Sequence, residues 1–260
     1  MDIVAGRVVT SLSVTADGTW SAEMAGGARA VFGSRADGDF SQPGRPADQA
    51  ARSALADVPW TWLSQVHGAG VVVVDEPGQH CGRPGDAAVS AVPGAGLVVL
   101  TADCAPVGLS SPQGVVGVAH AGWRGLLAGV VEATVAAMRE LGADEVVAVL
   151  GPCIRPHAYR FSPPDLDVMT AAFGPAARSV DTEGYPSLDL AGALGVSLGR
   201  AGATLAADAG TCTHCSGQHW SWRAGKDTAR QATVVWQAAP TGPGLDEGHE
   251  PVAGMNQWPA

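Results

Sequence analysis

The chain has 260 residues, of which 46% are hydrophobic and 15% are charged, and its formal net charge is −10 at pH 7. A chain of this length and composition can bury a large core, so we expect one folded domain. The negative charge argues against the classes of protein that bind nucleic acids or anionic membranes through a basic surface.

The sequence also has features of a cytoplasmic protein. No apolar run approaches the roughly 18 residues that a membrane-spanning helix needs. The N-terminal region lacks the charged, apolar and cleavage segments of a signal peptide. The odd number of cysteines, scattered along a long chain, fits reduced thiols better than a disulfide scaffold. We expect a cytoplasmic protein that is a monomer or a small homo-oligomer.

Strand patterns dominate the first third of the chain. We predict strands at 6–14 and 28–32 joined by a polar turn around Asp17-Gly18, a helix at 47–55, and strands at 60–67 and 71–74. Arg35 lies in a loop rich in Gly, Pro and Asp, where a solvated charge is the usual role. His67 ends its strand beside Gly68, where the backbone can turn and a ligand can approach.

The centre of the chain places a thiol and an imidazole after two apolar runs. Thr101-Ala102-Asp103-Cys104 follows the run 96–100, and His120-Ala121-Gly122-Trp123-Arg124-Gly125 follows the run 114–119. If both runs are buried strands, they bring Cys104 and His120 to the same end of a sheet. These are the side chains that zinc prefers, and His67 is a candidate third ligand. Helical spacing follows, at Leu127, Val131, Val135 and Met138.

Two carboxylates lie near these candidate ligands in the sequence. Asp103 could act as a proton acceptor or as an orienting group. Successive residues of a strand point to opposite faces, so either Asp103 or Cys104 must lie in the turn if both are functional. Asp86 could orient a metal-binding histidine or cap a helix, and the sequence does not separate these two interpretations.

The last third predicts a strand at 146–150, helices at 163–173 and 187–201, and a closing strand at 231–237. Cys212-Thr213-His214-Cys215 contains half of a metal knuckle, but without a partner pair a buried or redox-silent pair is favoured. Trp220-Ser221-Trp222-Arg223 alternates like a strand, with both tryptophans in the core and Arg223 at the mouth of a site. Residues 1–237 then form one catalytic domain, and 238–260 form a disordered tail rich in Pro, Gly and acidic residues.

Five of these segments together resemble the successive motifs of one family. The segments are Gln65-Val66-His67-Gly68, Thr101-Ala102-Asp103-Cys104-Ala105-Pro106, His120-Ala121-Gly122-Trp123-Arg124-Gly125, Gly151-Pro152-Cys153-Ile154 and Trp220-Ser221-Trp222-Arg223. They are similar to the YfiH or DUF152 family, which has been called laccase-like or multicopper polyphenol oxidase and is better described as purine nucleoside phosphorylases. The resemblance runs from about residue 28 to 237.

The resemblance implies an α+β fold, a single domain of layered mixed β-sheets flanked by helices. It also implies that His67, Cys104 and His120 bind Zn²⁺, with copper as a substitute in vitro. The implied activity is phosphorolysis of adenosine, inosine or methylthioadenosine, with adenosine deamination as a side activity. The implied partners are a purine nucleoside and phosphate.

The chemistry of phosphorolysis suggests further site residues. Phosphate must be held at the anomeric carbon, and the guanidinium groups of arginines suit this role because they bind phosphate in a bidentate manner. We therefore assign Arg35 and Arg223 as catalytic and substrate-binding residues, and Gln65 as a substrate-binding residue. Cys104 and Asp103 complete the catalytic set. We interpret Arg124, inside its turn, as structural.

The chain departs from the family pattern at its substrate end. Tyr159 is followed by Arg160 where the family often has glutamate, Ala224 replaces a second arginine, and Ala229-Arg230 replaces a Gly-Arg pair. The loop after Arg35 is shortened. If Arg160 faces the site it strengthens anion binding, whereas on a solvent-exposed loop, the favoured reading, it contributes little.

Three other functions fit parts of the pattern. A peptidoglycan-precursor editing hydrolase would use the same zinc or Cys104. A copper-dependent polyphenol oxidase, or laccase, needs several coppers and many histidine ligands, whereas only two of the seven histidines lie in the motifs. A non-catalytic zinc-binding module would have a closed coordination shell and would lose its fold on chelation.

Overall fold

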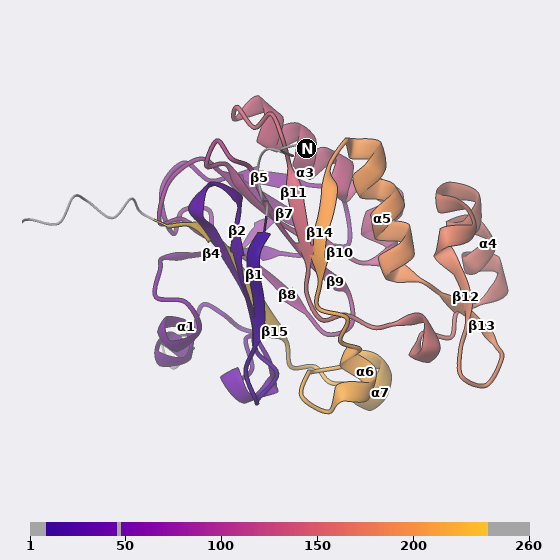
Figure 1. Cartoon of the computed structure of the whole chain (residues 1–260). Helices are drawn as coiled ribbons and strands as arrows, with labels where there is room; N and C mark the ends of the chain where they lie inside the picture. The colour runs from indigo at the N-terminus through magenta and orange to yellow at the C-terminus, as the bar shows by residue number, and fades with distance from the viewer. Residues whose placement is uncertain (1–8, 46–47, 239–260) are drawn as a thin grey trace, which may run out of the picture.

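Two β-sheets packed face to face form the centre of the structure, a computed structural model that describes residues 9–45 and 48–238 (Figure 1). The seven-stranded sheet has the spatial order β1 (Val9–Val14), β2 (Trp20–Met24), β3 (Ala28–Phe32), β15 (Gln231–Gln237), β8 (Gly96–Thr101), β4 (Trp60–Ser64) and β6 (Arg83–Pro84). The six-stranded sheet has the order β14 (Thr204–Asp208), β11 (Val147–Leu150), β9 (Ala105–Ser110), β10 (Val116–Ala121), β7 (Ala87–Ser90) and β5 (Val71–Val73). Both sheets are mixed.

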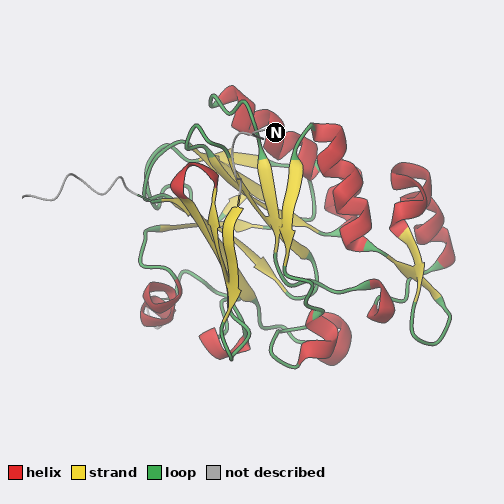
Figure 2. Cartoon of the chain, viewed as in Figure 1, coloured by secondary structure: helices red, strands yellow, loops and turns green. Residues whose placement is uncertain are grey.

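Several helices lie on the outer side of the six-stranded sheet, whereas one short helix packs against the outer face of the seven-stranded sheet (Figure 2). The helices are α1 (Gln49–Leu55), α2 (Trp123–Ala128), α3 (Val130–Glu140), α4 (Pro163–Phe173), α5 (Leu190–Ala201), α6 (Thr213–Ser216) and α7 (Trp222–Gly225). Short 3-10 turns are η1 (Ala25–Gly27), η2 (Arg35–Asp37), η4 (Pro156–Ala158) and η5 (Gly174–Ala177), and a small hairpin is formed by β12 (Arg178–Val180) and β13 (Pro186–Leu188). Within the described ranges, no helix is both long and apolar enough to cross a bilayer. The predicted α+β domain of layered mixed sheets flanked by helices is confirmed.

Side-chain alternation in the central strands builds separate core layers. In β10, Val116 and Val118 join the core between the two sheets, whereas Ala119 and Ala121 join the core beneath the helices. A strand buried on both faces needs apolar residues at every position, and β10 is buried throughout. A polar side chain in such a strand, His120, is therefore held in a defined environment.

Helix boundaries follow their capping residues. Helix α4 starts after Ser162, whose side chain accepts a hydrogen bond from the backbone N–H of Asp165, and its range agrees with the prediction. Helix α5 starts at Leu190 instead of 187, because 186–188 pair as strand β13 and Asp189 supplies the cap. It ends at Ala201 and is followed by Gly202, which has the left-handed backbone that suits glycine.

Several local predictions need correction. The hairpin partner of β1 is β2, which the prediction missed, while residues 6–8 and 47 lie outside the described residues. Strand β9 was not predicted because Pro106 and Gly108 weaken its strand pattern. Strand β4 ends at Ser64, so His67 lies in the following turn. The predicted tail, 238–260, falls outside the description except for Ala238.

The predicted strand at Trp220–Arg223 is wrong. Residues 222–225 form helix α7, because the Ser221 hydroxyl accepts a hydrogen bond from the Ala224 N–H and caps the turn. Trp222 is 48% exposed, so it is not a core residue. Two tryptophans spaced two apart are too short a pattern to outweigh a local helix cap.

Candidate active site

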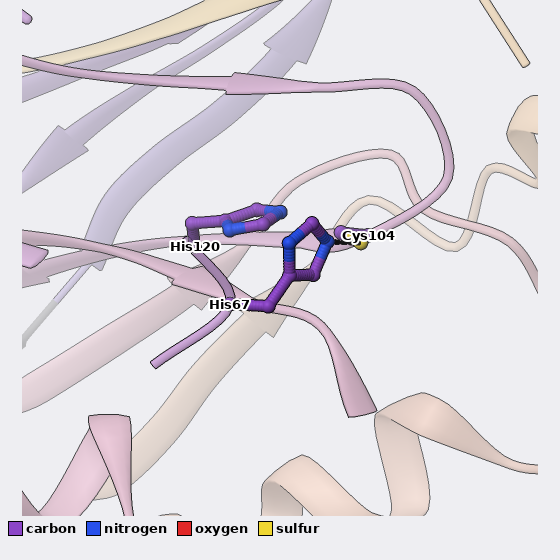
Figure 3. A group of neighbouring side chains, drawn as sticks. All are labelled: His67, Cys104 and His120. Carbon is purple, nitrogen blue, oxygen red and sulfur yellow. Dashed lines mark hydrogen bonds between the residues drawn. The ribbon is translucent and has the colours of Figure 1, made fainter. Parts of the chain in front are cut away.

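The side chains of His67, Cys104 and His120 lie together, although the chain separates them widely (Figure 3). Their donor atoms are all within 4.8 Å of one another. The Cys104 Sγ is 3.8 Å from His67 Nε2, and the two imidazole rings meet edge to face with centroids 4.7 Å apart. The structure thus brings together the three residues predicted as metal ligands.

Strand pairing places Cys104 beside His120. Strands β9 and β10 are antiparallel, with Ala105 opposite Ala121 and Pro106 opposite His120. Cys104 precedes Ala105 directly, so its thiol lies next to the end of β10. The turn 102–104 leads from β8 in one sheet to β9 in the other, and the site therefore lies where the chain crosses between the layers.

Asp86 connects the two histidines of this group. Its buried carboxylate accepts hydrogen bonds from the backbone N–H groups of Val66, His67 and Gly68, at 3.1, 2.9 and 2.8 Å. It also accepts one from His120 Nδ1 at 2.9 Å. The backbone of His67 is left-handed, with φ of 59°, and these three contacts hold it there. Asp86 therefore orients a histidine, one of its two predicted roles, and leaves His120 Nε2 free for a metal.

The charges of these groups depend on one another. Burial opposes ionisation of Cys104, but the charge and hydrogen bonds of His120 and His67 outweigh it and lower the pKa of the thiol to about 6. Burial also disfavours charged His120, but Cys104 and Asp86 raise the pKa of its imidazole to about 9. For Asp86, burial is outweighed by the hydrogen bonds it accepts, which lower its pKa. Without a metal, the site holds a thiolate and an imidazolium near neutral pH.

Asp103 lies in the turn before Cys104 with a left-handed backbone, φ 95°. Its Oδ1 accepts hydrogen bonds from the hydroxyls of Thr213 and Ser221, both at 2.7 Å, and its Oδ2 accepts one from the Arg223 N–H at 2.7 Å. Asp103 as a whole is 8% exposed. These contacts tie the turn that carries Cys104 to the segment that forms α6 and α7.

His67, Cys104 and His120 line a cavity of about 690 Å³. Its lining combines basic, aromatic and polar side chains: Arg124, Arg223, Arg230, Trp123, Tyr159, Trp222, Gln65, Ser41 and Thr228. This size falls in the range of pockets that take small organic ligands. The positive charge of the arginines is local, since the chain as a whole is acidic.

The two predicted phosphate arginines differ in position. Arg223 lines the cavity, lies 4.8 Å over the ring of Tyr159 and donates a hydrogen bond to the Arg160 carbonyl at 2.8 Å. Arg35 is not part of the lining. It pairs with Asp227 at 3.1 Å and stacks 4.1 Å over the ring of Trp220. The structure therefore does not bring Arg35 into the cavity wall.

Sequence reasoning missed two arginines of the lining. Arg124, interpreted as structural, is exposed and stacks over Trp123 at 4.1 Å. Arg230 was noted only as the remnant of a Gly-Arg pair, and one of its nitrogens donates to the backbone carbonyls of Asp227, Thr228 and Ala229. Its place in that motif was the signal that could have identified it.

Gln65 lines the cavity while its amide pairs with a neighbouring strand. Its Nε2 donates to the Leu100 carbonyl at 2.8 Å, and its Oε1 accepts from the Leu100 N–H at 2.7 Å. The side chain thus continues the pairing of β8 beyond the end of β4. One N–H and one lone pair remain for a ligand.

Arg160 does not line the cavity. Its half-exposed guanidinium pairs with Asp181 and Glu183, both at 2.8 Å, and lies 3.7 Å from the ring centre of Tyr185. Of the two positions considered for Arg160, the structure fits the solvent-exposed loop and not the substrate site. The carboxylates of Asp181 and Glu183 offset the positive charge of Arg160, which stands where the family often has glutamate.

Comparison with known proteins shows the family of this chain and its named relatives. The family described as multi-copper polyphenol oxidoreductase laccase matches residues 45–238. The chain belongs to this family. A protein of Streptomyces coelicolor named purine nucleoside phosphorylase is 44% identical over 179 residues, which cover 67% of this chain and 74% of that protein. The Escherichia coli purine nucleoside phosphorylase YfiH is 34% identical over 67% of this chain and 71% of its own.

Solved structures of this family share the fold. YlmD of Geobacillus stearothermophilus superposes with a TM-score of 0.72 at 24% identity, covering 88% of this chain and 99% of YlmD. A Neisseria meningitidis protein of family DUF152 gives 0.71 at 24% identity, covering 90% of this chain and all of that protein. The predicted membership of the YfiH or DUF152 family is confirmed.

Proposed function

We propose that this protein is a zinc-dependent purine nucleoside phosphorylase. The carrying observation is that His67, Cys104 and His120 converge at a cavity that three arginines also line. Relatives that are 34–44% identical carry the name purine nucleoside phosphorylase. We propose the cytoplasm as its compartment, in keeping with five free thiols.

The three donors fit a zinc ion. One thiolate and two imidazoles are ligands that zinc accepts, and the 3.8 Å between Cys104 Sγ and His67 Nε2 is close to the roughly 3.6 Å that separates such ligands in a tetrahedral zinc site. Zinc with one thiolate and two neutral imidazoles has a net charge of +1 and would supply Lewis acidity at an open position. His120 must be neutral to bind it, so metal uptake would release the proton that His120 holds.

Phosphorolysis joins a phosphate oxygen to the anomeric carbon and breaks the glycosidic C–N bond, whose electron pair leaves with the purine. The chain's own contribution is to position both reactants and to stabilise charge. Arg223, Arg124 and Arg230 would hold phosphate, and Tyr159 and Trp222 offer rings against which a purine can stack. Gln65 would donate its remaining N–H to the substrate.

The other predicted residues have supporting roles in this proposal. Cys104 is a ligand, and Asp103 is a positioning residue, because its hydrogen bonds to Thr213, Ser221 and Arg223 occupy the carboxylate. Arg35 lies outside the cavity lining, where it stacks on Trp220 and pairs with Asp227, so this proposal does not use it to hold phosphate. We propose adenosine deamination as a side activity of the same site.

The test is incubation of the metal-loaded protein with adenosine, with and without phosphate. Phosphorolysis predicts adenine and ribose 1-phosphate only when phosphate is present, whereas deamination yields inosine and ammonia. Arg223→Ala should raise the KM for phosphate about tenfold or more, because a charged hydrogen bond contributes about 1.5–3 kcal/mol. Arg160→Ala is the matched control. Base release without phosphate, or oxidation of phenols by the copper-loaded protein alone, would contradict the proposal.

A further inference from the structure

A second group of metal-binding side chains lies outside the cavity. The sequence Cys212-Thr213-His214-Cys215 is half of a knuckle, and the structure supplies a third donor from a distant segment, His157 of η4. The donor atoms of His157, Cys212 and Cys215 are all within 4.8 Å of one another. The Cys215 Sγ lies 3.4 Å from His157 Nε2.

Backbone contacts fix the two segments that carry these donors. Cys212 lies directly before α6 and pairs as an isolated parallel bridge with Cys153. The Cys153 N–H donates to the Thr211 carbonyl at 3.3 Å, and the Thr213 N–H donates to the Cys153 carbonyl at 3.2 Å. The next residues lead to η4, whose start is anchored by an ion pair between Arg155 and Asp208 of β14. The trio is thus held by the paired segments that follow β11 and β14.

We propose that His157, Cys212 and Cys215 form a second site for a divalent transition metal of the zinc class. Zinc bonds of about 2.3 Å to sulfur and about 2.0–2.1 Å to nitrogen place these ligands about 3.6 Å apart in a tetrahedron. The 3.4 Å separation of Cys215 Sγ and His157 Nε2 is close to this spacing. Two thiolates and one neutral imidazole leave a zinc ion with no net charge, and soft thiolates select zinc over magnesium or calcium.

The exposure of the trio indicates how the metal is reached. Cys212 is buried, whereas Cys215 and His157 are exposed. The metal therefore has a path from solvent, and water completes its coordination. Solvent access also makes the free thiols available to oxidation, so the competing state of this pair is a disulfide between Cys212 and Cys215.

The position of the site gives it a structural role. Thr213, between the two cysteines, donates its hydroxyl hydrogen bond to Asp103, and Ser221 and Arg223 of the following segment contact the same carboxylate. A metal that joins η4 to α6 would fix this segment against the turn that carries Cys104. It would stabilise the cavity wall without contacting a substrate, and the site is independent of the reaction proposed above.

The test uses the full chain in a Cys104→Ser background, in which the first site lacks its thiolate. The reduced protein is freed of metal and titrated with Co²⁺, and the cobalt–thiolate charge-transfer absorbance is followed. We expect this absorbance to saturate at about one Co²⁺ per chain and to be lost on addition of excess Zn²⁺. Cys215→Ser should remove most of it and His157→Ala should weaken Co²⁺ binding about tenfold or more. Both residues are exposed, so these variants should fold, which far-UV circular dichroism checks.

Cys81→Ser is the matched control, because Cys81 is also an exposed free thiol but lies outside the trio. It should leave the absorbance and the Co²⁺ affinity unchanged. The proposal is overturned if no charge-transfer absorbance develops, or if Cys215→Ser and His157→Ala match the parent. It is also overturned if freshly purified protein carries a Cys212–Cys215 disulfide by mass and its reduced form binds no Co²⁺. None of these readouts depends on nucleoside turnover, so failure of the proposed reaction would leave the result intact.

Discussion

At the scale of single residues, Asp86 is the side chain whose hydrogen bonds connect His67 and His120. It holds three consecutive backbone N–H groups around His67 and the Nδ1 of His120, while its own side chain is fully buried. A neutral amide has one acceptor oxygen, so it cannot replace a carboxylate that accepts four hydrogen bonds. Both histidines therefore depend on the charge and the two oxygens of Asp86.

Asp86→Asn should lower zinc affinity about 10–100-fold, the range found when a partner of a metal-bound histidine is lost. Competition with a chromogenic chelator measures this affinity. Asp75→Asn is the control, since the Asp75 side chain is 76% exposed and lies away from the three ligands. Equal zinc affinity in parent and Asp86→Asn would show that Asp86 does not orient the ligands.

The coupled charges of Cys104 and His120 give a second prediction at this scale. In the metal-free protein, thiolate absorbance from Cys104 should appear as the pH rises through about 6, well below an ordinary thiol. The difference spectrum between parent and Cys104→Ser isolates this signal from the other cysteines. His120→Ala should move the midpoint upward, because it removes the positive charge and a hydrogen bond that favour the thiolate. An unchanged midpoint in His120→Ala would refute this coupling.

At the scale of elements, the junction between β10 and α2 has little free space. Gly122 directly precedes α2, and a Cβ atom added there would lie 3.0 Å from both Cys104 Sγ and His67 Cδ2. Glycine at this position lets the helix start directly beside two of the predicted metal ligands. Its importance is steric, because its backbone is extended, with φ −73°, and open to any residue.

Gly122→Ala should weaken zinc binding about tenfold, equivalent to about 1.4 kcal/mol, because Cys104 and His67 must move apart to admit the methyl group. Gly195→Ala in α5 is the matched control, since an added Cβ there meets no atom within 4 Å. That control should keep its zinc affinity. The steric explanation fails if Gly122→Ala binds zinc as tightly as the parent.

At the scale of the whole molecule, the apolar cores are extensive enough that we expect the fold to be stable without a metal. Separate apolar cores lie between the sheets, beneath α3, α4 and α5, and beneath α1. These layers contain large buried side chains such as Phe32, Leu109 and Met138. Burial of this extent stabilises a domain without a metal, unlike a small zinc module that folds only around its ion.

Removal of metal should therefore abolish phosphorolysis and leave the chain folded. We expect an unchanged far-UV circular dichroism spectrum at 25 °C and a lower Tm. A ligand present at about 1,000 times its Kd adds about 4 kcal/mol to stability, and this contribution is lost with the metal. Readdition of zinc should restore both activity and Tm. Loss of secondary structure on chelation would instead support a metal-stabilised binding module.

The sequence by itself determined the elements whose signals are local. The apolar runs before Cys104 and His120 predicted buried strands, and the Ser162 cap with Pro163 marked the start of α4, because a hydrophobic period or a cap acts within a few residues. The motifs around His67, Cys104 and His120 also indicated the ligand set that the structure brings together.

Only the tertiary structure decided which distant segments meet. The hydrogen bonds of Asp103 to Ser221 and Arg223 span more than a hundred residues, and they hold the start of α7 against the turn that carries Cys104. Strand order likewise places His157 beside the Cys212–Cys215 pair and keeps Arg35 out of the cavity. Such contacts depend on how the strands connect and how the sheets pack. The hydrophobic pattern within one segment therefore cannot predict them.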